Sequence, residues 1–253
     1  MILAILQARL SSRRLPGKVL LPVLGQPLLG RQIERVRRAK RIDRLIVATS
    51  TDSSDDRLAE LCAAMEVECF RGSLDDVLDR FCQAAQKYHP EHVVRLTGDC
   101  PLADPEVIDA VIAHHLDGGF DYTANFLPPT FPHGLDAEVI RWTVLQTAAK
   151  EAVLPWDREH VTEFVLQRPE RFRRGEYRNG EDLSALRWTV DHAEDFTVVR
   201  TIYEALYPGN PEFSTVDIRQ FLDAHPTLKT SNTHHHRDEA WKLASREDEE
   251  SRK

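Results

Sequence analysis

The residues best suited to chemistry lie in a basic loop directly after the first apolar segment of the chain. Residues 2–6 read Ile-Leu-Ala-Ile-Leu, which is typical of a buried strand, and residues 7–18 read Gln-Ala-Arg-Leu-Ser-Ser-Arg-Arg-Leu-Pro-Gly-Lys. Serine and glycine let backbone N–H groups approach an anion, and the loop supplies positive charge through Arg9, Arg13, Arg14 and Lys18. The loop matches neither the G-x-x-x-x-G-K-[ST] nor the G-x-G-x-x-G phosphate-binding pattern. It is nevertheless a plausible place to hold a polyphosphate.

Two aspartates further along the chain are candidates for binding a divalent cation beside that loop. Asp99 follows the apolar run 93–97, and Asp191 follows the apolar run 186–190. Mg²⁺ prefers one or two carboxylates together with phosphate oxygens and water. Nucleotidyl transfer needs such an ion, an oriented triphosphate and stabilisation of the leaving pyrophosphate. The alternative for each aspartate is a turn or cap residue, which is common after a strand.

The elements that must position these residues alternate between strands and helices. We expect strands at residues 2–6, 45–49, 67–70, 93–97, 136–140 and 186–190. We expect helices at residues 27–38, 54–65, 74–88, 105–116, 141–150, 158–167, 195–206 and 215–224. This alternation predicts an α/β fold with a mostly parallel sheet covered on both faces. Because ligands bind at the carboxyl ends of such strands, the basic loop, Asp99 and Asp191 are expected at one edge.

Four ordered motifs resemble those of the cytidylyltransferases that activate acidic sugars, a family that includes the CMP-sialate and CMP-KDO synthetases. They are residues 7–18, Arg-Gly-Ser-x-Asp-Asp-Val-Leu-x-Arg at 71–80, Leu-Thr-Gly-Asp-Cys-Pro at 96–101, and Trp-Thr-Val-Asp-His-Ala-Glu-Asp at 188–195. The most similar branch is the spore coat polysaccharide F (SpsF) type. In the family the last motif usually reads Asp-x-Pro-Glu-Asp, and here Ala193 replaces the proline. Asp195 is therefore also a candidate cap for the helix that follows.

The resemblance implies a single Rossmann-like, three-layer domain of the nucleotide-diphospho-sugar transferase type, which we expect over residues 1–228. It implies an enzyme that transfers CMP from CTP to an acidic sugar or similar small acid in surface polysaccharide or glycoconjugate synthesis. The expected catalytic residues are Lys18, Arg9 and Asp99, and the expected Mg²⁺ ligands are Asp99 and Asp191. The expected nucleotide contacts are Leu6, Gln7, Ala8, Arg9, Arg14, Lys18, Arg71 and Asp76. An ordinary i,i+4 ion pair with Arg80 is the alternative role for Asp76.

Residues 131–139, Phe-Pro-His-Gly-Leu-Asp-Ala-Glu-Val, are the best candidate for the acceptor pocket. They close the irregular, Gly- and Pro-rich stretch 118–138, which is long for a loop without a function. His133, Asp136 and Glu138 are the candidate acceptor contacts, and Asp136 and Glu138 would share one face of a strand. A surface loop histidine is the alternative for His133. The resemblance implies that this region also helps to form a homodimer.

Bulk properties limit the possible functions. The chain has 253 residues, is 42% hydrophobic and carries a net charge of −8, which argues against a nucleic-acid partner. No apolar run approaches the ~20 residues of a membrane span, and the apolar start is too short for a signal peptide. We therefore expect a cytoplasmic protein with reduced cysteines. Residues 229–253 form a polar, charged tail, helical or disordered, in which His234–His236 is a weak metal candidate.

Two other functions remain open at this point. A glycosyltransferase that uses a nucleotide-sugar would share the nucleotide half of such a fold, but it would release no pyrophosphate from a free triphosphate. A non-catalytic nucleotide- or sugar-binding subunit of a polysaccharide pathway would bind without turnover. Transfer of UMP or GMP is also open, because base choice rests on few atoms.

Overall fold

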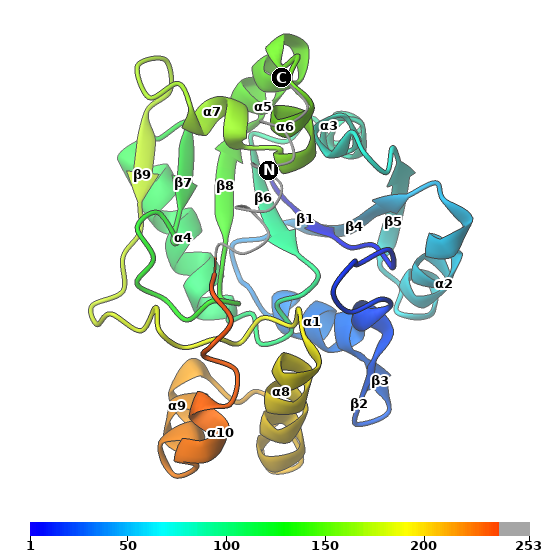
Figure 1. The fold of residues 1–253 in the computed structure, drawn as a ribbon. Helices are drawn as coiled ribbons and strands as arrows, with labels where there is room; N and C mark the ends of the chain where they lie inside the picture. The colour runs from blue at the N-terminus through cyan, green and yellow to red at the C-terminus, as the bar shows by residue number, and fades with distance from the viewer. Residues whose placement is uncertain (238–253) are drawn as a thin grey trace, which may run out of the picture.

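A seven-stranded mixed sheet forms the centre of the molecule (Figure 1). The computed structural model describes residues 1–237, and residues 238–253 lie outside this description. The strand order across the sheet is β5 (Glu68–Gly72), β4 (Arg44–Ser50), β1 (Ile2–Gln7), β6 (His92–Thr97), β8 (Glu138–Arg141), β7 (Tyr122–Ala124) and β9 (Arg174–Glu176). The first four strands are parallel to one another. β8 is antiparallel to both β6 and β7, and β7 is parallel to β9.

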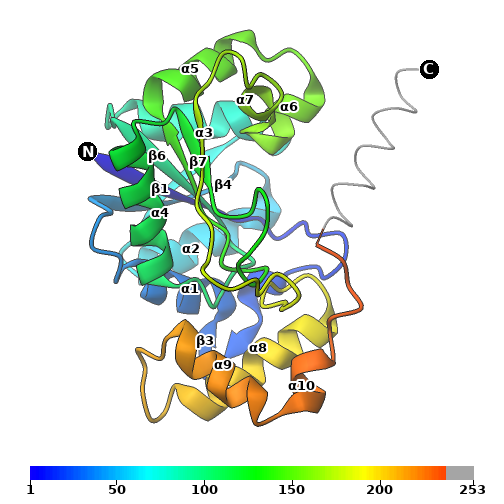
Figure 2. The same cartoon turned by 90° about the vertical axis from the view of Figure 1, so that its left-hand side faces the viewer.

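Helices cover both faces of the sheet (Figures 1 and 2). One face packs on α1 (Leu28–Val36), α2 (Asp56–Ala64) and α4 (Pro105–Gly118). The other packs on α3 (Val77–Gln86), α5 (Trp142–Glu151) and α7 (Glu163–Leu166), with α6 (Pro155–His160) beside α3.

The central strand β1 shows why two helical layers are needed. Leu3 and Ile5 belong to one apolar cluster and Ala4 and Leu6 to the other, because successive side chains of a strand point to opposite faces. A strand that is apolar at every position must be covered on both sides. The expected three-layer α/β fold is confirmed.

A third apolar cluster lies below the sheet and includes the segment that carries Asp191 (Figure 1). Trp188 and Val190 pack there against α8 (Ala193–Leu206) and α9 (Thr215–Asp223). The short hairpin β2 (Pro22–Val23) and β3 (Gln26–Pro27), α10 (Pro226–Thr230) and the 3-10 turn η1 (Lys18–Leu20) complete this end of the molecule. Apolar packing thus fixes the segment around Asp191 without a sheet strand.

Local sequence signals place most helix starts correctly. Asp104 caps α4 through hydrogen bonds from the backbone N–H groups of Glu106 and Val107, and Pro105 is the first helical residue. Ser214 caps α9 in a capping box with Asp217. The expected helix at 158–167 is instead two short helices, α6 and α7, separated at Val161 with φ 62°.

Two strand predictions need correction. The expected strand at 186–190 is wrong, since that segment forms only an isolated bridge between His133 and Arg187. The expected strand at 136–140 begins two residues later as β8 and runs antiparallel to β6. The stretch 118–138, expected to be irregular, contains β7. The pairings of β7 and β8 join segments that are separated in the sequence, so local patterns do not reveal them.

The chain from residue 229 to 237 contacts the rest of the protein, as described below for Asn232 and Arg237. The domain boundary at residue 228 stays a prediction, and most of the expected tail lies outside the described residues. Within residues 1–237, every helix is too short or too polar to cross a membrane.

Candidate active site

The carboxyl ends of the four parallel strands bring the basic loop and Asp99 to one edge of the sheet. β1 and β6 are paired up to Gln7 and Thr97, so the residues that follow both strands emerge side by side. The backbone N–H of Gly98 donates to the Gln7 carbonyl at 2.8 Å. A Cβ atom at position 98 would lie 2.9 Å from the Ala8 Cβ and 3.0 Å from the Gln7 oxygen. Glycine is therefore needed for the two loops to approach this closely.

Lys18 joins the two aspartates that the sequence singled out. Its ammonium Nζ lies 3.0 Å from Asp99 Oδ2 and 2.8 Å from Asp191 Oδ1, and the residue is 7% exposed. Burial alone would lower the pKa of Lys18, but the two carboxylates outweigh it and hold the pKa above its ordinary value. Burial likewise opposes ionisation of Asp99, yet Lys18 and Thr97 hold its pKa below the usual range. Lys18 and Asp99 are therefore both charged at neutral pH.

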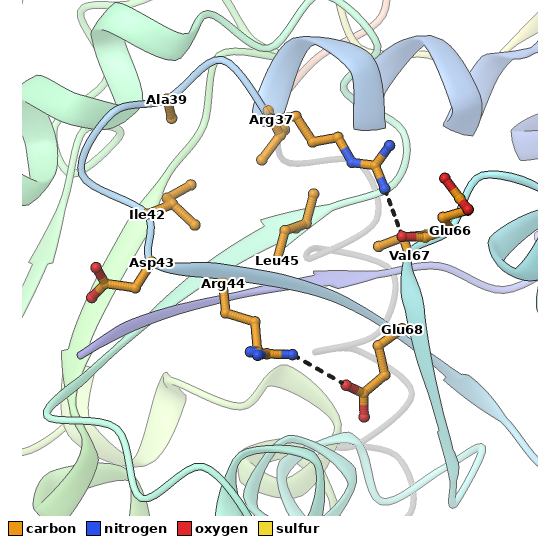
Figure 3. Close-up of a pocket in the computed structure, with 10 residues that line it drawn as sticks. Arg37, Ala39, Ile42, Asp43, Arg44, Leu45, Glu66, Val67 and Glu68 are labelled. Atoms are coloured by element: carbon orange, nitrogen blue, oxygen red, sulfur yellow. Dashed lines mark hydrogen bonds and ion pairs between the residues drawn. The ribbon is translucent and has the colours of Figure 1, made fainter.

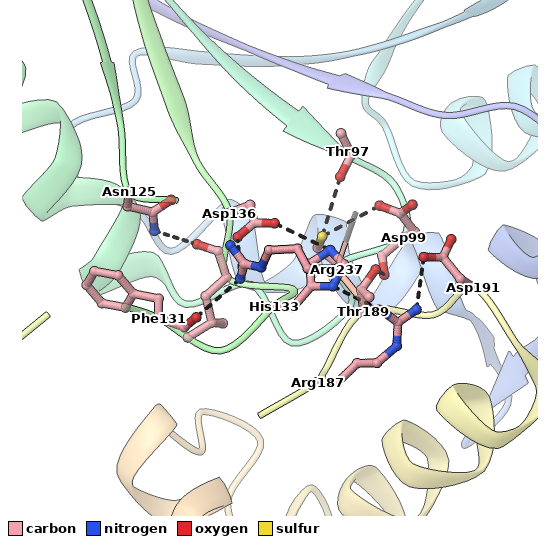
Figure 4. Close-up of polar contacts among 12 residues, drawn as sticks. Thr97, Asp99, Asn125, Phe131, His133, Asp136, Arg187, Thr189, Asp191 and Arg237 are labelled. Atoms are coloured by element: carbon pink, nitrogen blue, oxygen red, sulfur yellow. Dashed lines mark hydrogen bonds and ion pairs between the residues drawn. The ribbon is translucent and has the colours of Figure 1, made fainter. Parts of the chain in front are cut away.

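Asp191 reaches the site from a loop held by backbone hydrogen bonds. The Val190 N–H donates to the Asp99 carbonyl at 2.8 Å, and the Thr189 N–H donates to the His133 carbonyl at 2.9 Å. Asp191 also pairs with Arg14 at 2.6 Å. Its other oxygen pairs with Arg187 at 3.1 Å (Figure 4). The predicted convergence of the basic loop, Asp99 and Asp191 is thus correct, although the supposed strand before Asp191 does not exist.

Arg187 and Asp195 form a buried support behind Asp191. Arg187 Nε and Nη2 donate to the two Asp195 oxygens at 2.9 and 3.0 Å, and Nη2 also reaches Asp191. Asp195 Oδ2 accepts the backbone N–H groups of Asp191 and His192, so it caps α8. The sequence predicted this cap but missed Arg187. Its signal was an arginine inside an otherwise apolar run, which was interpreted as a strand.

On the acceptor side, His133 and Asp136 lie beside Asp99 (Figure 4). His133 Nδ1 is 3.1 Å from Arg187 Nη1, and Nε2 is 3.7 Å from Asp136 Oδ2. Burial, Arg237 and Arg187 lower the pKa of His133 to about 4, so the ring is neutral at pH 7. Burial raises the pKa of Asp136 to about 6 despite the nearby Arg237. Because an arginine N–H can only donate, His133 Nδ1 accepts and Nε2 carries the ring proton.

Glu138 belongs to a separate buried network. It is 3% exposed, and its carboxylate is bound by Arg95, by the Tyr122 hydroxyl at 2.9 Å and by the Thr162 hydroxyl at 2.7 Å. Asp136 precedes β8 and has different partners. A direct contact between Glu138 and an acceptor stays a prediction.

The remaining candidate nucleotide residues differ in their environment. Arg9 is exposed, and no hydrogen bond or ion pair joins it to another residue of the described chain. Arg71 donates to the carbonyls of Ser50 and Asp52, both at 2.9 Å, and pairs with Asp56. Arg71 therefore stabilises the turn after β4.

Asp76 caps α3 and pairs with Arg158 at 2.6 Å. The alternative i,i+4 ion pair with Arg80 does not form, because the Arg80 guanidinium donates to the Ser73 carbonyl instead.

The two aspartates suit a divalent cation. Asp99 and Asp191 present hard oxygen ligands on either side of a single ammonium, and Mg²⁺ takes one or two carboxylates together with phosphate oxygens and water. Within residues 1–237, no group of three or more His, Cys, Asp or Glu side chains is placed to bind a metal ion.

A separate cavity of about 280 Å³ lies at the opposite edge of the sheet, near the starts of β4 and β5 (Figure 3). Both arginines that line it have partners: Arg37 donates to the Met65 and Glu66 carbonyls, and Arg44 pairs with Glu68 at 3.8 Å. It shares no residue with the site around Lys18.

The chain is similar to known cytidylyltransferases in sequence and in fold. The model of the cytidylyltransferase family matches residues 3–205. The chain is 35% identical over 245 residues to the spore coat polysaccharide biosynthesis protein SpsF of Bacillus subtilis, covering 90% of this chain and 97% of that protein. A solved cytidylyltransferase structure from Leptospira borgpetersenii superposes with a TM-score of 0.87 at 32% identity, covering 93% and 99% of the two chains. A CMP:2-keto-3-deoxy-manno-octonic acid synthetase solved with CTP shares the fold, with a TM-score of 0.60 at 19% identity over 80% and 98% of the chains.

Proposed function

The chain belongs to the cytidylyltransferase family of nucleotidyltransferases, and from that premise we propose that it transfers CMP from CTP to a sugar acid in polysaccharide synthesis. The observation that carries the proposal is the bridge from Lys18 to Asp99 and Asp191, directly beside the basic loop. Relatives named 3-deoxy-manno-octulosonate cytidylyltransferases, such as that of Zea mays, support a sugar acid as the acceptor class.

The nucleotide half of the proposed site is the loop after β1. Arg9 has no partner among residues 1–237, so its guanidinium donors can bind the triphosphate, while Arg14 and Lys18 add positive charge beside Asp191. The backbone of Leu6, Gln7 and Ala8 forms the floor beneath the base. Arg71 and Asp76 support this half through the turn after β4 and the start of α3.

In the proposed reaction, an acceptor hydroxyl oxygen forms a bond to the α-phosphorus of CTP. The bond from that phosphorus to the bridging oxygen breaks, and pyrophosphate leaves with the bonding electrons. Lys18 and Arg9 stabilise the developing charge, and Asp136 takes up the proton of the hydroxyl. Asp99 and Asp191 would hold Mg²⁺, which when bound would further neutralise charge on the phosphate oxygens. His133 remains neutral and positions the acceptor through its Nε2–H.

The test is pyrophosphate release from CTP, UTP, GTP and ATP, each with and without Mg²⁺, in the presence of a panel of sugar acids. We expect release that requires CTP, Mg²⁺ and one acid together. Binding of CTP without release in every combination would favour a non-catalytic subunit. Release of nucleoside diphosphate from a nucleotide-sugar, without use of free CTP, would favour a glycosyltransferase. We also propose a homodimer, to be measured by light scattering on the purified protein.

A further inference from the structure

We propose that the segment of residues 231–237 completes the acceptor half of the site and that Arg237 recognises the carboxylate of the acceptor. This inference rests on the proposed function for the identity of the ligand. It assigns a specificity-determining role to a part of the chain that lies beyond the matched family region of residues 3–205.

The segment is anchored to the residues that support Asp191. Asn232 is 1% exposed, and its Nδ2 donates to the Arg187 carbonyl at 3.0 Å and to Asp195 Oδ1 at 2.8 Å. The His235 ring stacks on His192 with centroids 3.8 Å apart and an angle of 4° between the planes. Because Arg187 and Asp195 also position Asp191, the segment is fixed to the site itself.

Beyond this anchor, the Arg237 side chain reaches the acceptor side (Figure 4). Its Nη2 donates to the Phe131 carbonyl at 3.2 Å and lies 3.3 Å from Asp136 Oδ1. Its Nε and Nη1 atoms are buried and have no hydrogen-bond partner among the described residues. Buried guanidinium donors without partners are costly, so this geometry calls for an additional acceptor group.

Three other cations near the acceptor side are already paired, and Arg9 lies in the nucleotide half of the proposed site. Lys18 and Arg14 pair with the aspartates on the side of the basic loop, and Arg187 is bound to Asp195 and Asp191. Arg237 stands apart from them, against the chain that leads into β8. A planar guanidinium with two spare N–H groups matches a carboxylate in a bidentate geometry. An acid acceptor would thus be held by Arg237 while its hydroxyl faces Asp136.

The experiment is a calorimetric titration of the full-length protein with 3-deoxy-manno-octulosonate, a sialic acid and the methyl ester of each, with CMP present to fill the nucleotide half. The variants are Arg237→Met and Arg237→Lys. The matched control is Lys229→Met, which removes one positive charge from the same end of the chain at a surface pair with Asp223. CTP and pyrophosphate affinities are measured in parallel.

We expect the wild type to bind at least one acid more tightly than its ester. Arg237→Met should weaken binding of that acid by roughly ten- to a hundredfold and leave the ester, CTP and pyrophosphate unchanged. The affinity of Arg237→Lys for the acid should lie between those of the wild type and Arg237→Met. This second variant keeps the test decisive if the methionine variant does not fold. Lys229→Met should bind like the wild type.

Equal acid affinity in wild type and both Arg237 variants would overturn the inference. It would also be overturned if no acid is preferred over its ester, or if the variants lose affinity for CTP or pyrophosphate instead, since the guanidinium would then serve the phosphates. Failure of the proposed function gives a different result: the wild type would release no pyrophosphate from CTP, whatever the calorimetry shows for Arg237.

Discussion

Lys18 and Asp191 are 173 residues apart in the sequence, yet the Lys18 Nζ lies 2.8 Å from Asp191 Oδ1. The same ammonium reaches Asp99, so one side chain ties the basic loop, the end of β6 and the segment before α8 together. The site therefore forms only when these three distant parts of the chain have come together.

Replacing Asp99 with asparagine is expected to abolish Mg²⁺-dependent turnover, because an amide oxygen is a much weaker ligand for Mg²⁺ and a weaker partner for Lys18. Turnover should fall by at least about a hundredfold. Mn²⁺ binding, measured by electron paramagnetic resonance with nucleotide present, should weaken in parallel. Asp117→Asn, an exposed position on α4, is the matched control and should behave like wild type. Near-normal turnover in Asp99→Asn would refute the metal assignment.

A methyl group at position 98 should disrupt the contact between the loop after β1 and the loop after β6. The added Cβ in Gly98→Ala would lie 2.9 Å from the Ala8 Cβ and 3.0 Å from the Gln7 carbonyl oxygen. Relieving these contacts requires a shift of the backbone, which costs free energy. We expect a loss of about 1–3 kcal/mol in the free energy of unfolding, measured with urea, and a loss of nucleotide affinity. Gly180→Ala is the control, because a Cβ there has nothing within 4 Å. Equal effects of both substitutions would contradict this account.

Asn232→Ala should reveal how far the C-terminal segment stabilises the fold. Removing the amide leaves the Arg187 carbonyl without its Asn232 donor and removes one of the two side-chain donors to Asp195 Oδ1, at a cost of about 1–3 kcal/mol. The melting temperature should fall by several degrees, in contrast to the exposed neighbour Thr233→Ala. An unchanged melting temperature would show that the segment contributes little to stability.

Acid should destabilise the protein through His115. This ring is fully buried between Thr123 Oγ1 and His92 Nδ1, and burial, with His92, Arg141 and His114 nearby, lowers its pKa to about 3. Between the ordinary pKa of about 6.5 and pH 3, the unfolded chain binds a proton that the folded protein does not. The free energy of unfolding should therefore fall by about 1.4 kcal/mol per pH unit from this residue as the pH drops below about 6.5.

The measurement for His115 is urea unfolding between pH 4.5 and 7.5. His115→Gln should flatten the pH dependence by about one proton. An identical slope in wild type and His115→Gln would contradict the assignment, provided that both unfold cooperatively.

Asp136 should set the acid limb of the pH–rate profile. Burial raises its pKa to about 6, so the group is protonated below that value and cannot take up the proton of the acceptor. Turnover should rise as the pH passes through about 6 and then level off. Asp136→Asn should be slow at every pH and lack this limb, while CTP binding persists. If turnover of Asp136→Asn still fell below the same pH, a group other than Asp136 would be responsible for the acid limb.

The sequence by itself determined the features that depend on neighbouring residues. The sequence predicted correctly that a buried strand at 2–6 precedes the basic loop and that Asp104 and Ser214 cap helices. It also predicted that a polar loop follows the strand at 93–97. These predictions succeed because strand burial and helix capping depend on residues close in sequence. The parallel sheet followed from the alternation of elements, and it placed Lys18 and Asp99 at one edge.

Only the tertiary structure decided how Asp191, Arg187 and Arg237 reach that edge. The segment before Asp191 resembles a strand in composition, but its backbone N–H groups donate to the carbonyls of Asp99 and His133 rather than to a sheet neighbour. Arg187 and Asn232 look like ordinary polar residues until their buried partners on other segments are known. Hydrogen bonds and ion pairs between distant segments exist only in the assembled fold, so no local pattern encodes them.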